Sequence, residues 1–98
     1  MADIVITARA ATTFTAAGAL DEDAMGAHLQ RLVDQRIGVL LGSCGSGEGG
    51  SLTRDELKRV YEIGVSVGKG KVLVGSNQPE QFTARNSIEH ARLAIDAG

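Results

Sequence analysis

The sequence predicts a parallel α/β fold of three consecutive βα units in sequential strand order, as at the start of a (β/α)8 TIM barrel. Short apolar segments alternate with segments of helical periodicity, so the order of elements is βαβαβα. The second short segment is apolar at every position, whereas the first is interrupted by Thr7 and Arg9. A flavodoxin-like sheet would place the first strand at its centre, so this difference favours the barrel-like order.

The length of the chain sets the expected domain organisation. The chain has 98 residues, whereas a complete barrel of this type needs about 250. We therefore expect residues 1–98 to be the N-terminal fragment of a single barrel domain. Three such units alone would leave two unpaired sheet edges and an exposed apolar surface, and both features promote association.

The first unit is expected to contain a strand over 4–11 and a helix that begins after Asp21. The strand segment is short and rich in β-branched residues, with Thr7 and Arg9 on a partly wet face. Asp21 is a favourable N-cap residue, and the helix is expected to end at about Arg36. Its apolar residues recur at steps of three and four, and they are Ala24, Met25, Leu29, Leu32 and Val33.

The second unit begins with the uninterrupted apolar segment 37–41, which is typical of a strand covered on both faces. The loop 42–51 follows, and five of its ten residues are glycine, so its backbone can adopt conformations that other residues avoid. Thr53 and Glu56 have the spacing of a capping box, which predicts a helix that ends near residues 68–70. The apolar positions of this helix are Leu57, Val60, Tyr61, Gly64 and Val67.

The third unit is predicted from a strand segment at 71–75, a polar loop at 76–82 and a helix capped by Thr83. The apolar stripe expected on this helix consists of Ile88, Ala91 and Ile95.

Composition excludes several classes of partner and site. Ten Lys and Arg against twelve Asp and Glu give a net charge of −2, and without a basic block we expect no nucleic-acid partner. One cysteine allows neither an internal disulfide nor a zinc cluster, so we expect no metal. There is no apolar segment of the roughly 20 residues that a membrane span needs and no secretory signal, which together predict a cytoplasmic protein.

The glycine-rich loop formally matches a dinucleotide-binding motif. Gly45, Gly47 and Gly50 have the spacing G-x-G-x-x-G between a strand and a helix. A Rossmann unit should carry an acidic residue at the tip of the next strand, but residues 75–77 there are Gly-Ser-Asn. A dinucleotide-binding βαβ unit is therefore the less favoured alternative, and we expect no cofactor.

Two other functions are possible for the loop. Cys44 could be a nucleophile, but His28 and His90 fall in predicted helices near polar faces, so a small residue in a tight turn is the favoured role. Alternatively, the loop could bind a small anionic substrate, because it follows the carboxyl end of a parallel strand, where barrel active sites are built. The candidate substrate-binding residues are then Gly42, Ser43, Cys44 and Gly45.

The loop resembles a known signature. Gly42-Ser43-Cys44-Gly45, Glu48, Ser51-Leu52-Thr53 and Glu56 are similar to the G-T-T-G-E-x-x-T-L-x-x-x-E pattern of the dihydrodipicolinate synthase and N-acetylneuraminate lyase superfamily. The likeness extends over essentially the whole chain. It includes Thr12-Thr13-Phe14, which is similar to the family's T-P-F, the helix start at 20–24 and the strand end at 74–77.

The resemblance implies a pyruvate-dependent class I aldolase or lyase on a (β/α)8 barrel, usually a homotetramer, in which a lysine forms a Schiff base with a 2-oxo acid such as pyruvate. It implies that Ser43 helps to hold the substrate carboxylate and that Cys44 occupies a proton-relay position. The family's Schiff-base lysine and its tyrosine would lie beyond Gly98, so the 98-residue chain alone should be inactive.

Departures from the signature point to a divergent member acting on another 2-oxo acid or a sugar acid. These departures are the thiol of Cys44, Thr13 in place of proline and the insertion of Ser46 and Gly47 before Glu48. The alternative from a different functional class is a non-catalytic half-barrel that serves as an interaction module, favoured by the exposed sheet edges.

Overall fold

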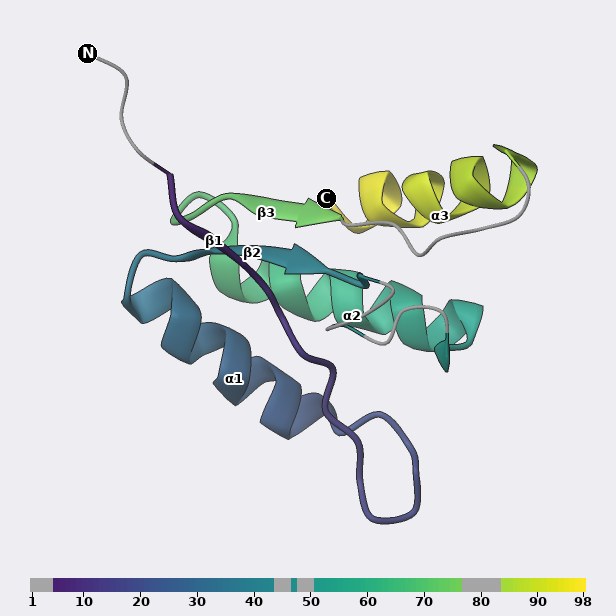
Figure 1. Cartoon of the computed structure of the whole chain (residues 1–98), viewed down its shortest axis with the longest axis horizontal. Coiled ribbons are helices and arrows are strands. Elements are labelled where there is room, and N and C mark those ends of the chain that lie inside the picture. The colour runs from purple at the N-terminus through teal and green to yellow at the C-terminus, as the bar shows by residue number, and fades with distance from the viewer. Residues whose placement is uncertain (1–4, 44–46, 48–50, 77–83) are drawn as a thin grey trace.

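The computed structural model describes residues 5–43, 47, 51–76 and 84–98. It contains the expected alternation of strands and helices (Figure 1). In chain order the elements are β1 (Thr7–Arg9), α1 (Glu22–Asp34), β2 (Gly38–Leu41), α2 (Arg54–Gly68), β3 (Val74–Ser76) and α3 (Ala84–Ala97).

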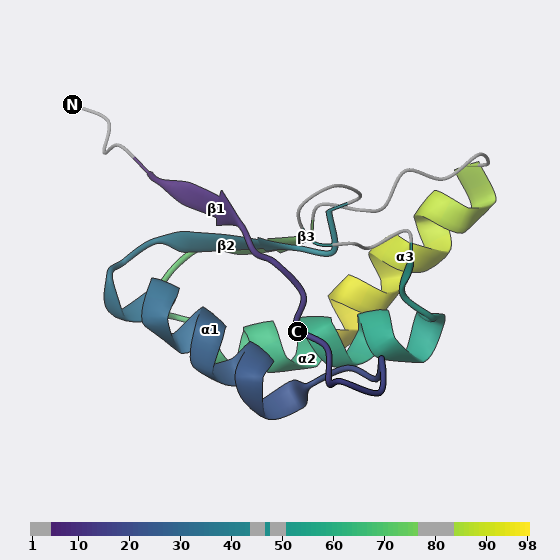
Figure 2. The same cartoon turned by 60° about the horizontal axis from the view of Figure 1, so that its bottom comes forward.

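The strands form a parallel sheet in the sequential order β1-β2-β3, which confirms the predicted strand order. Ala8 pairs with Val39, and Val39 in turn pairs with Val74, so these three residues lie on the same face of the sheet. Helices α1 and α2 lie beneath one face of the sheet, and α3 lies beside α2 (Figure 2). No helix that the structure describes covers the opposite face.

The starts of the first two helices agree with the sequence. Asp21 caps α1, because its carboxylate accepts a hydrogen bond of 3.0 Å from the backbone N–H of Ala24. The capping box of α2 is complete, with a 3.1 Å bond from the Glu56 N–H to Thr53 and a 2.9 Å bond from the Thr53 N–H to Glu56. Helix α1 ends at Asp34, slightly earlier than expected, because the chain turns through Arg36 with φ of 59°.

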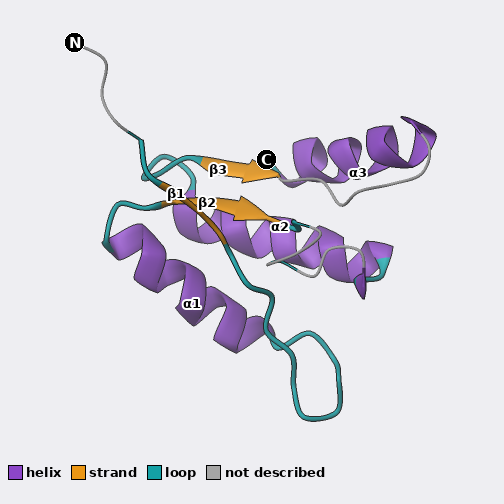
Figure 3. Cartoon of the chain, viewed as in Figure 1, coloured by secondary structure: helices purple, strands orange, loops and turns teal. Residues whose placement is uncertain are grey.

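Two of the predicted strands have different bounds. β1 covers three residues of the expected 4–11, although ladder hydrogen bonds continue on both sides, to Ile6 O and from Ala10 N. β3 lies at Val74–Ser76 rather than at 71–75, because the backbone N–H groups of Lys71 and Val72 donate back to Gly68 O. These two residues therefore form a turn after α2, and the orange strands in Figure 3 are short.

The core lies between the sheet and the first two helices, and β2 is the most buried strand. Val39 and Leu41 are almost fully buried, whereas Leu40, on the opposite face of β2, is half-buried because no described helix covers it. The other main core residues are Met25 and Leu29 from α1, and Leu57, Val60 and Tyr61 from α2.

The prediction of which residues of α3 face the core is wrong. Ile88 is 52% exposed and Ile95 is 74% exposed, while Leu93, Ala94 and Ala97 pack against the core. Helix α3 lies against α2, and the Ile88–Ile95 stripe lies on another side of the helix. Val5, Ile6 and Leu73 are also exposed, as expected for a sheet with open edges. None of the helices in the described ranges combines the length and apolar character that crossing a bilayer requires.

Candidate functional site

The candidate site lies at the carboxyl ends of the three parallel strands, which meet at one edge of the sheet. Thr12 follows β1, Gly42 and Ser43 follow β2, and Ser76 is the last residue of β3. Of the four predicted substrate-binding residues, the structure therefore places Gly42 and Ser43 at this edge. Cys44 and Gly45 lie outside the described residues.

Gly42 makes the turn that leaves β2, and this position requires glycine. Its φ is 72°, in the left-handed region that side chains disfavour. A Cβ atom at Gly42 would lie 2.8 Å from Leu57 Cδ1 and 3.3 Å from the Tyr61 hydroxyl oxygen. The start of the loop is therefore pressed directly against helix α2.

Ser43 and Thr12 each form a hydrogen bond with the backbone of Gly47. Ser43 is 2% exposed, and its Oγ accepts a hydrogen bond of 2.8 Å from the backbone N–H of Gly47. Thr12, also buried, donates its hydroxyl proton to the carbonyl oxygen of the same residue. A Cβ at Gly47 would lie 2.7 Å from Ser43 N, so this close approach also requires glycine.

This arrangement defines what Ser43 can do chemically. One lone pair of its Oγ accepts the Gly47 N–H, and the hydroxyl proton remains a donor for a second partner. A hydroxyl at the end of a parallel strand can donate to a carboxylate oxygen. Sequence reasoning included Thr12 and Gly47 only as parts of motifs, and the tertiary contact that joins them had no local signal.

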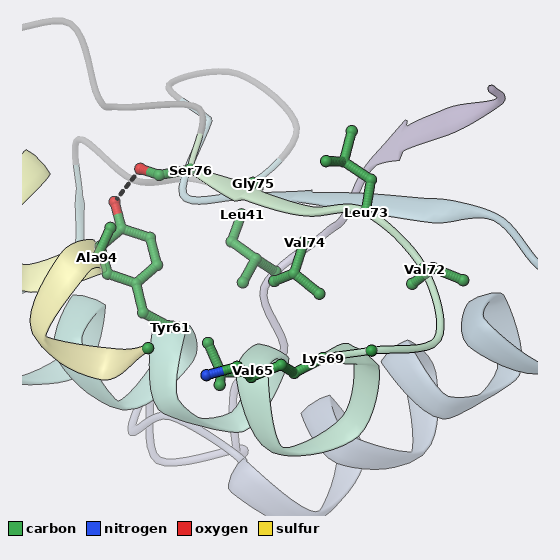
Figure 4. Close-up of a pocket in the computed structure, with 12 residues that line it drawn as sticks. Leu41, Tyr61, Val65, Lys69, Val72, Leu73, Val74, Gly75, Ser76 and Ala94 are labelled. Atoms are coloured by element: carbon green, nitrogen blue, oxygen red, sulfur yellow. Dashed lines mark hydrogen bonds between the residues drawn. The ribbon is translucent and has the colours of Figure 1, made fainter.

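Tyr61 brings a phenol to the same edge from beneath the sheet (Figure 4). Its hydroxyl accepts a hydrogen bond of 2.9 Å from Ser76 Oγ. Tyr61 is 2% exposed, and this burial raises the pKa of its phenol, while the bond from Ser76 acts in the opposite direction. The sequence placed Tyr61 in the core stripe of α2 and missed its hydroxyl, although a tyrosine within an aliphatic stripe indicates that a polar partner is needed.

An apolar cavity of about 220 Å³ lies between β3, α2 and α3. Its walls include Leu41, Val65, Val74 and Ala94, with Lys69 among the lining residues. Leu73 points away from the helices in Figure 4. Lys69 is the C-cap residue of α2 and precedes the amino end of β3, whereas Gly42 follows the carboxyl end of β2. In the part of the chain that the structure describes, no three His, Cys, Asp or Glu side chains are grouped to hold a metal ion.

The fold matches that of solved structures from one class of architecture. A solved Pseudomonas aeruginosa protein assigned as a dihydrodipicolinate synthetase superimposes with a TM-score of 0.83 at 24% identity, over 99% of this chain and 33% of its own. N-acetylneuraminate lyase from Mycoplasma synoviae gives a TM-score of 0.80 at 21% identity, over 94% of this chain and 32% of its own. The chain thus has the α/β architecture, with a parallel sheet and helices, of TIM-barrel proteins of this kind.

The family follows from the sequence matches. The model of the dihydrodipicolinate synthetase family matches residues 3–98, so the chain belongs to this family, as its motifs predicted. It is similar to a "Probable 5-dehydro-4-deoxyglucarate dehydratase" from Bacillus licheniformis, with 32% identity over 87% of this chain and 27% of the relative. It is also similar to a 4-hydroxy-tetrahydrodipicolinate synthase from Sulfurovum sp., with 36% identity over 82% of this chain and 28% of the relative.

The chain spans just over a quarter of the length of these two relatives. The family is one of lyase-type enzymes, and the two relatives are named for different reactions, a dehydratase and a synthase. Membership therefore places the chain in a family of lyase-type enzymes, whose members named here differ in reaction.

Proposed function

We propose that the whole protein is a pyruvate-dependent class I aldolase or lyase that works through a Schiff base, and that this chain supplies the loop that binds the substrate carboxylate. The observation that carries the proposal is the turn at Gly42 and Ser43, braced through Gly47 at the carboxyl end of β2, in a chain of the dihydrodipicolinate synthetase family. The substrate-binding residues are Gly42, Ser43, Cys44 and Gly45.

In the proposed reaction, the amine of a lysine attacks the carbonyl carbon of a 2-oxo acid, and water leaves to form an iminium ion. The iminium accepts the electron pair when a C–H or C–C bond next to it breaks. None of Lys58, Lys69 and Lys71 is proposed for this role. Lys58 is exposed on helix α2, and Lys69 and Lys71 lie at the amino end of β3, whereas barrel active sites use the carboxyl ends.

The residues of this chain act on the substrate carboxylate and on a proton. The hydroxyl of Ser43 accepts the Gly47 N–H through a lone pair and can donate its proton to a carboxylate oxygen. Cys44 occupies the proposed proton-relay position next to it. A thiol is a weaker hydrogen-bonding group than a hydroxyl, which favours a divergent member of the family that acts on a 2-oxo acid or sugar acid other than the substrate of lysine biosynthesis. The similarity to a dehydratase named for 5-dehydro-4-deoxyglucarate supports a sugar acid, although the chain is also similar to a synthase.

We also propose that residues 1–98 form the first three βα units of a complete (β/α)8 barrel in a cytoplasmic homotetramer. The solved neighbours are about three times as long as the part that matches this chain. The exposed Val5, Ile6, Leu73, Ile88 and Ile95 are apolar side chains that further barrel units or subunits would cover.

Trapping of the imine tests the function. The natural gene product is incubated with pyruvate and reduced with borohydride, and its intact mass should increase by one reduced pyruvate per chain. Lactate, which has no carbonyl at that carbon, is the matched control and should add nothing. A full-length protein that forms no pyruvate adduct would refute the proposal and favour the non-catalytic interaction module.

The role of Cys44 is tested by the exchange of pyruvate methyl protons with deuterated solvent, which requires a proton to leave the iminium. We expect Cys44→Ala to slow this exchange by about a hundredfold, because a positioned proton-transfer group commonly contributes at least that much. Cys44→Ser places a hydroxyl at the same position and should keep the rate of proton exchange. Equal exchange by Cys44→Ala and the natural protein would remove Cys44 from the relay.

A further inference from the structure

The phenol of Tyr61 joins three parts of the fold that meet at the carboxyl edge of the sheet. Its ring belongs to α2 and is packed in the core, and its hydroxyl bonds to Ser76, the last residue of β3. The same hydroxyl oxygen lies 3.3 Å from where a Cβ would stand at Gly42, the first residue after β2. One buried oxygen therefore lies at the ends of two neighbouring strands (Figure 4).

The phenol of Tyr61 lies beside Gly42, at the start of the loop, and occupies the space that a side chain at Gly42 would need. Gly42 adopts a φ of 72° and is followed directly by Ser43. Ser43 is buried and bonds to Gly47, which Thr12 holds from the other side. A shift of the phenol would therefore move Gly42 and, through it, the hydroxyl of Ser43.

The bond from Ser76 keeps the phenol in place. A tyrosine ring can slide or tilt within an apolar core, and a hydrogen bond at its tip fixes the position of the oxygen. Ser76 is only half-buried, so its hydroxyl can turn to water if the phenol oxygen is removed. Tyr61→Phe thus removes the hydrogen bond with Ser76 and keeps the aromatic ring. It leaves no buried donor without a partner, because the Ser76 hydroxyl can bond to water.

We propose that Tyr61 is a positioning residue for the substrate-carboxylate loop, acting through Gly42 and held by its hydrogen bond with Ser76. The inference rests on the proposed function, because it assigns Tyr61 an effect on the binding of the 2-oxo acid. Without the phenol oxygen, the hydrogen bond from the Gly47 N–H to Ser43 Oγ should weaken. This effect does not depend on whether pyruvate is the substrate.

The test uses Tyr61→Phe and Ser76→Ala in the natural gene product, singly and together. Each single variant should raise the pyruvate concentration that gives half-maximal borohydride trapping by about threefold to tenfold, the range that one hydrogen bond spans. The maximal amount of trapped adduct should stay unchanged. The double variant should resemble either single variant, because both remove the same bond.

Hydrogen exchange of the Gly47 amide gives a readout that does not depend on pyruvate. It should be faster in Tyr61→Phe and in Ser76→Ala than in the natural protein, because the N–H then bonds less firmly to Ser43. Two controls separate positioning from a general loss of stability. Val33→Ala makes a core lesion near Gly68, at the other end of α2, and Ser66→Ala removes an exposed hydroxyl from the same helix. Neither control should change the half-maximal pyruvate concentration.

The two possible failures can be told apart. If the natural protein traps no pyruvate, the proposed function is wrong, and with it the assigned effect on binding. If it traps pyruvate and both variants keep the natural half-maximal concentration and the natural Gly47 exchange rate, the function stands and the positioning role is refuted. If Tyr61→Phe does not fold, Ser76→Ala alone decides the question, because its lesion is outside the core.

Discussion

Replacing the helical glycines Gly26 and Gly64 with alanine should change stability in opposite directions. Alanine is favoured over glycine within a helix by about 1 kcal/mol, and both residues lie inside helices. A Cβ at Gly26 would meet nothing closer than Ile63 Cγ2 at 4.0 Å. Gly26→Ala should therefore stabilise the fold by about 1 kcal/mol.

At Gly64 the packing of the sheet on α2 outweighs the helix preference. A Cβ there would lie 2.3 Å from Leu41 Cδ1, closer than two non-bonded carbon atoms can approach. Leu41 is 1% exposed in the centre of the core, and overpacking at such a position costs about 1–3 kcal/mol. After the gain in helix preference, Gly64→Ala should destabilise the chain by up to about 2 kcal/mol.

Urea unfolding of the natural gene product and its two variants, followed by circular dichroism, measures this difference. Leu41→Val removes the Cδ atoms that the new Cβ would meet, so the double variant should be more stable than the sum of the two single changes predicts. If Gly64→Ala stabilised the chain as much as Gly26→Ala, the close packing of β2 on α2 would be refuted.

Three further predictions concern the turns, caps and titration of the fold. Gly42→Ala should lower the free energy of unfolding by about 2–5 kcal/mol in the same assay, because Gly42 combines a positive φ with close neighbours. Gly70 also has a positive φ but has open space around it, so Gly70→Ala should lower the free energy of unfolding by only about 1–2 kcal/mol. Thr53→Ala removes the N-cap of α2 and should lower the free energy of unfolding by about 1 kcal/mol. Ser66→Ala removes an exposed hydroxyl from the same helix and should change it little. Equal unfolding midpoints for the two variants would contradict the role of Thr53 as a cap. Burial raises the pKa of Tyr61 above its ordinary value of 10.0, so the folded state holds the phenol proton more tightly, and stability should fall as the pH rises above 10; Tyr61→Phe should lack this part of the loss in an unfolding series against pH.

The local signals in the sequence were sufficient to predict the starts of the first two helices and the central strand, whereas the predicted cap of the third helix, Thr83, lies outside the described residues. The cap at Asp21 and the capping box at Thr53 and Glu56 depend on residues within one turn of each other, so spacing alone reveals them. The uninterrupted apolar segment of β2 correctly indicated the most buried strand, and its contrast with the first strand gave the sheet order.

The errors concern features that depend on distant partners. Lys71 and Val72 have strand-like neighbours in the sequence, but hydrogen bonds back to Gly68 O hold them in a turn. On α3, periodicity identified an apolar stripe at Ile88 and Ile95, while contact with α2 buries a different face. A pattern shows that a stripe exists, and only the tertiary structure shows which face has a partner.

The location of the candidate site was predictable from the sequence, but the contacts between its residues were only partly so. The end of an all-apolar strand followed by glycine was enough to locate Gly42 and Ser43. The bracing of Gly47 joins Thr12 and Ser43, which are far apart in the sequence, and the bond between Tyr61 and Ser76 joins a helix to a strand end. Such contacts leave no local pattern. The predicted roles of Cys44 and Gly45 stay predictions.

The most direct test of the account is the intact mass of the natural gene product before and after borohydride reduction with pyruvate. We expect a mass well above the 10.2 kDa of these 98 residues, and an increase by one reduced pyruvate per chain on a lysine outside them. A product of greater mass that gains no adduct would contradict the Schiff-base mechanism. A product of 10.2 kDa without an adduct would contradict the proposal of a whole-barrel enzyme and leave a non-catalytic interaction module.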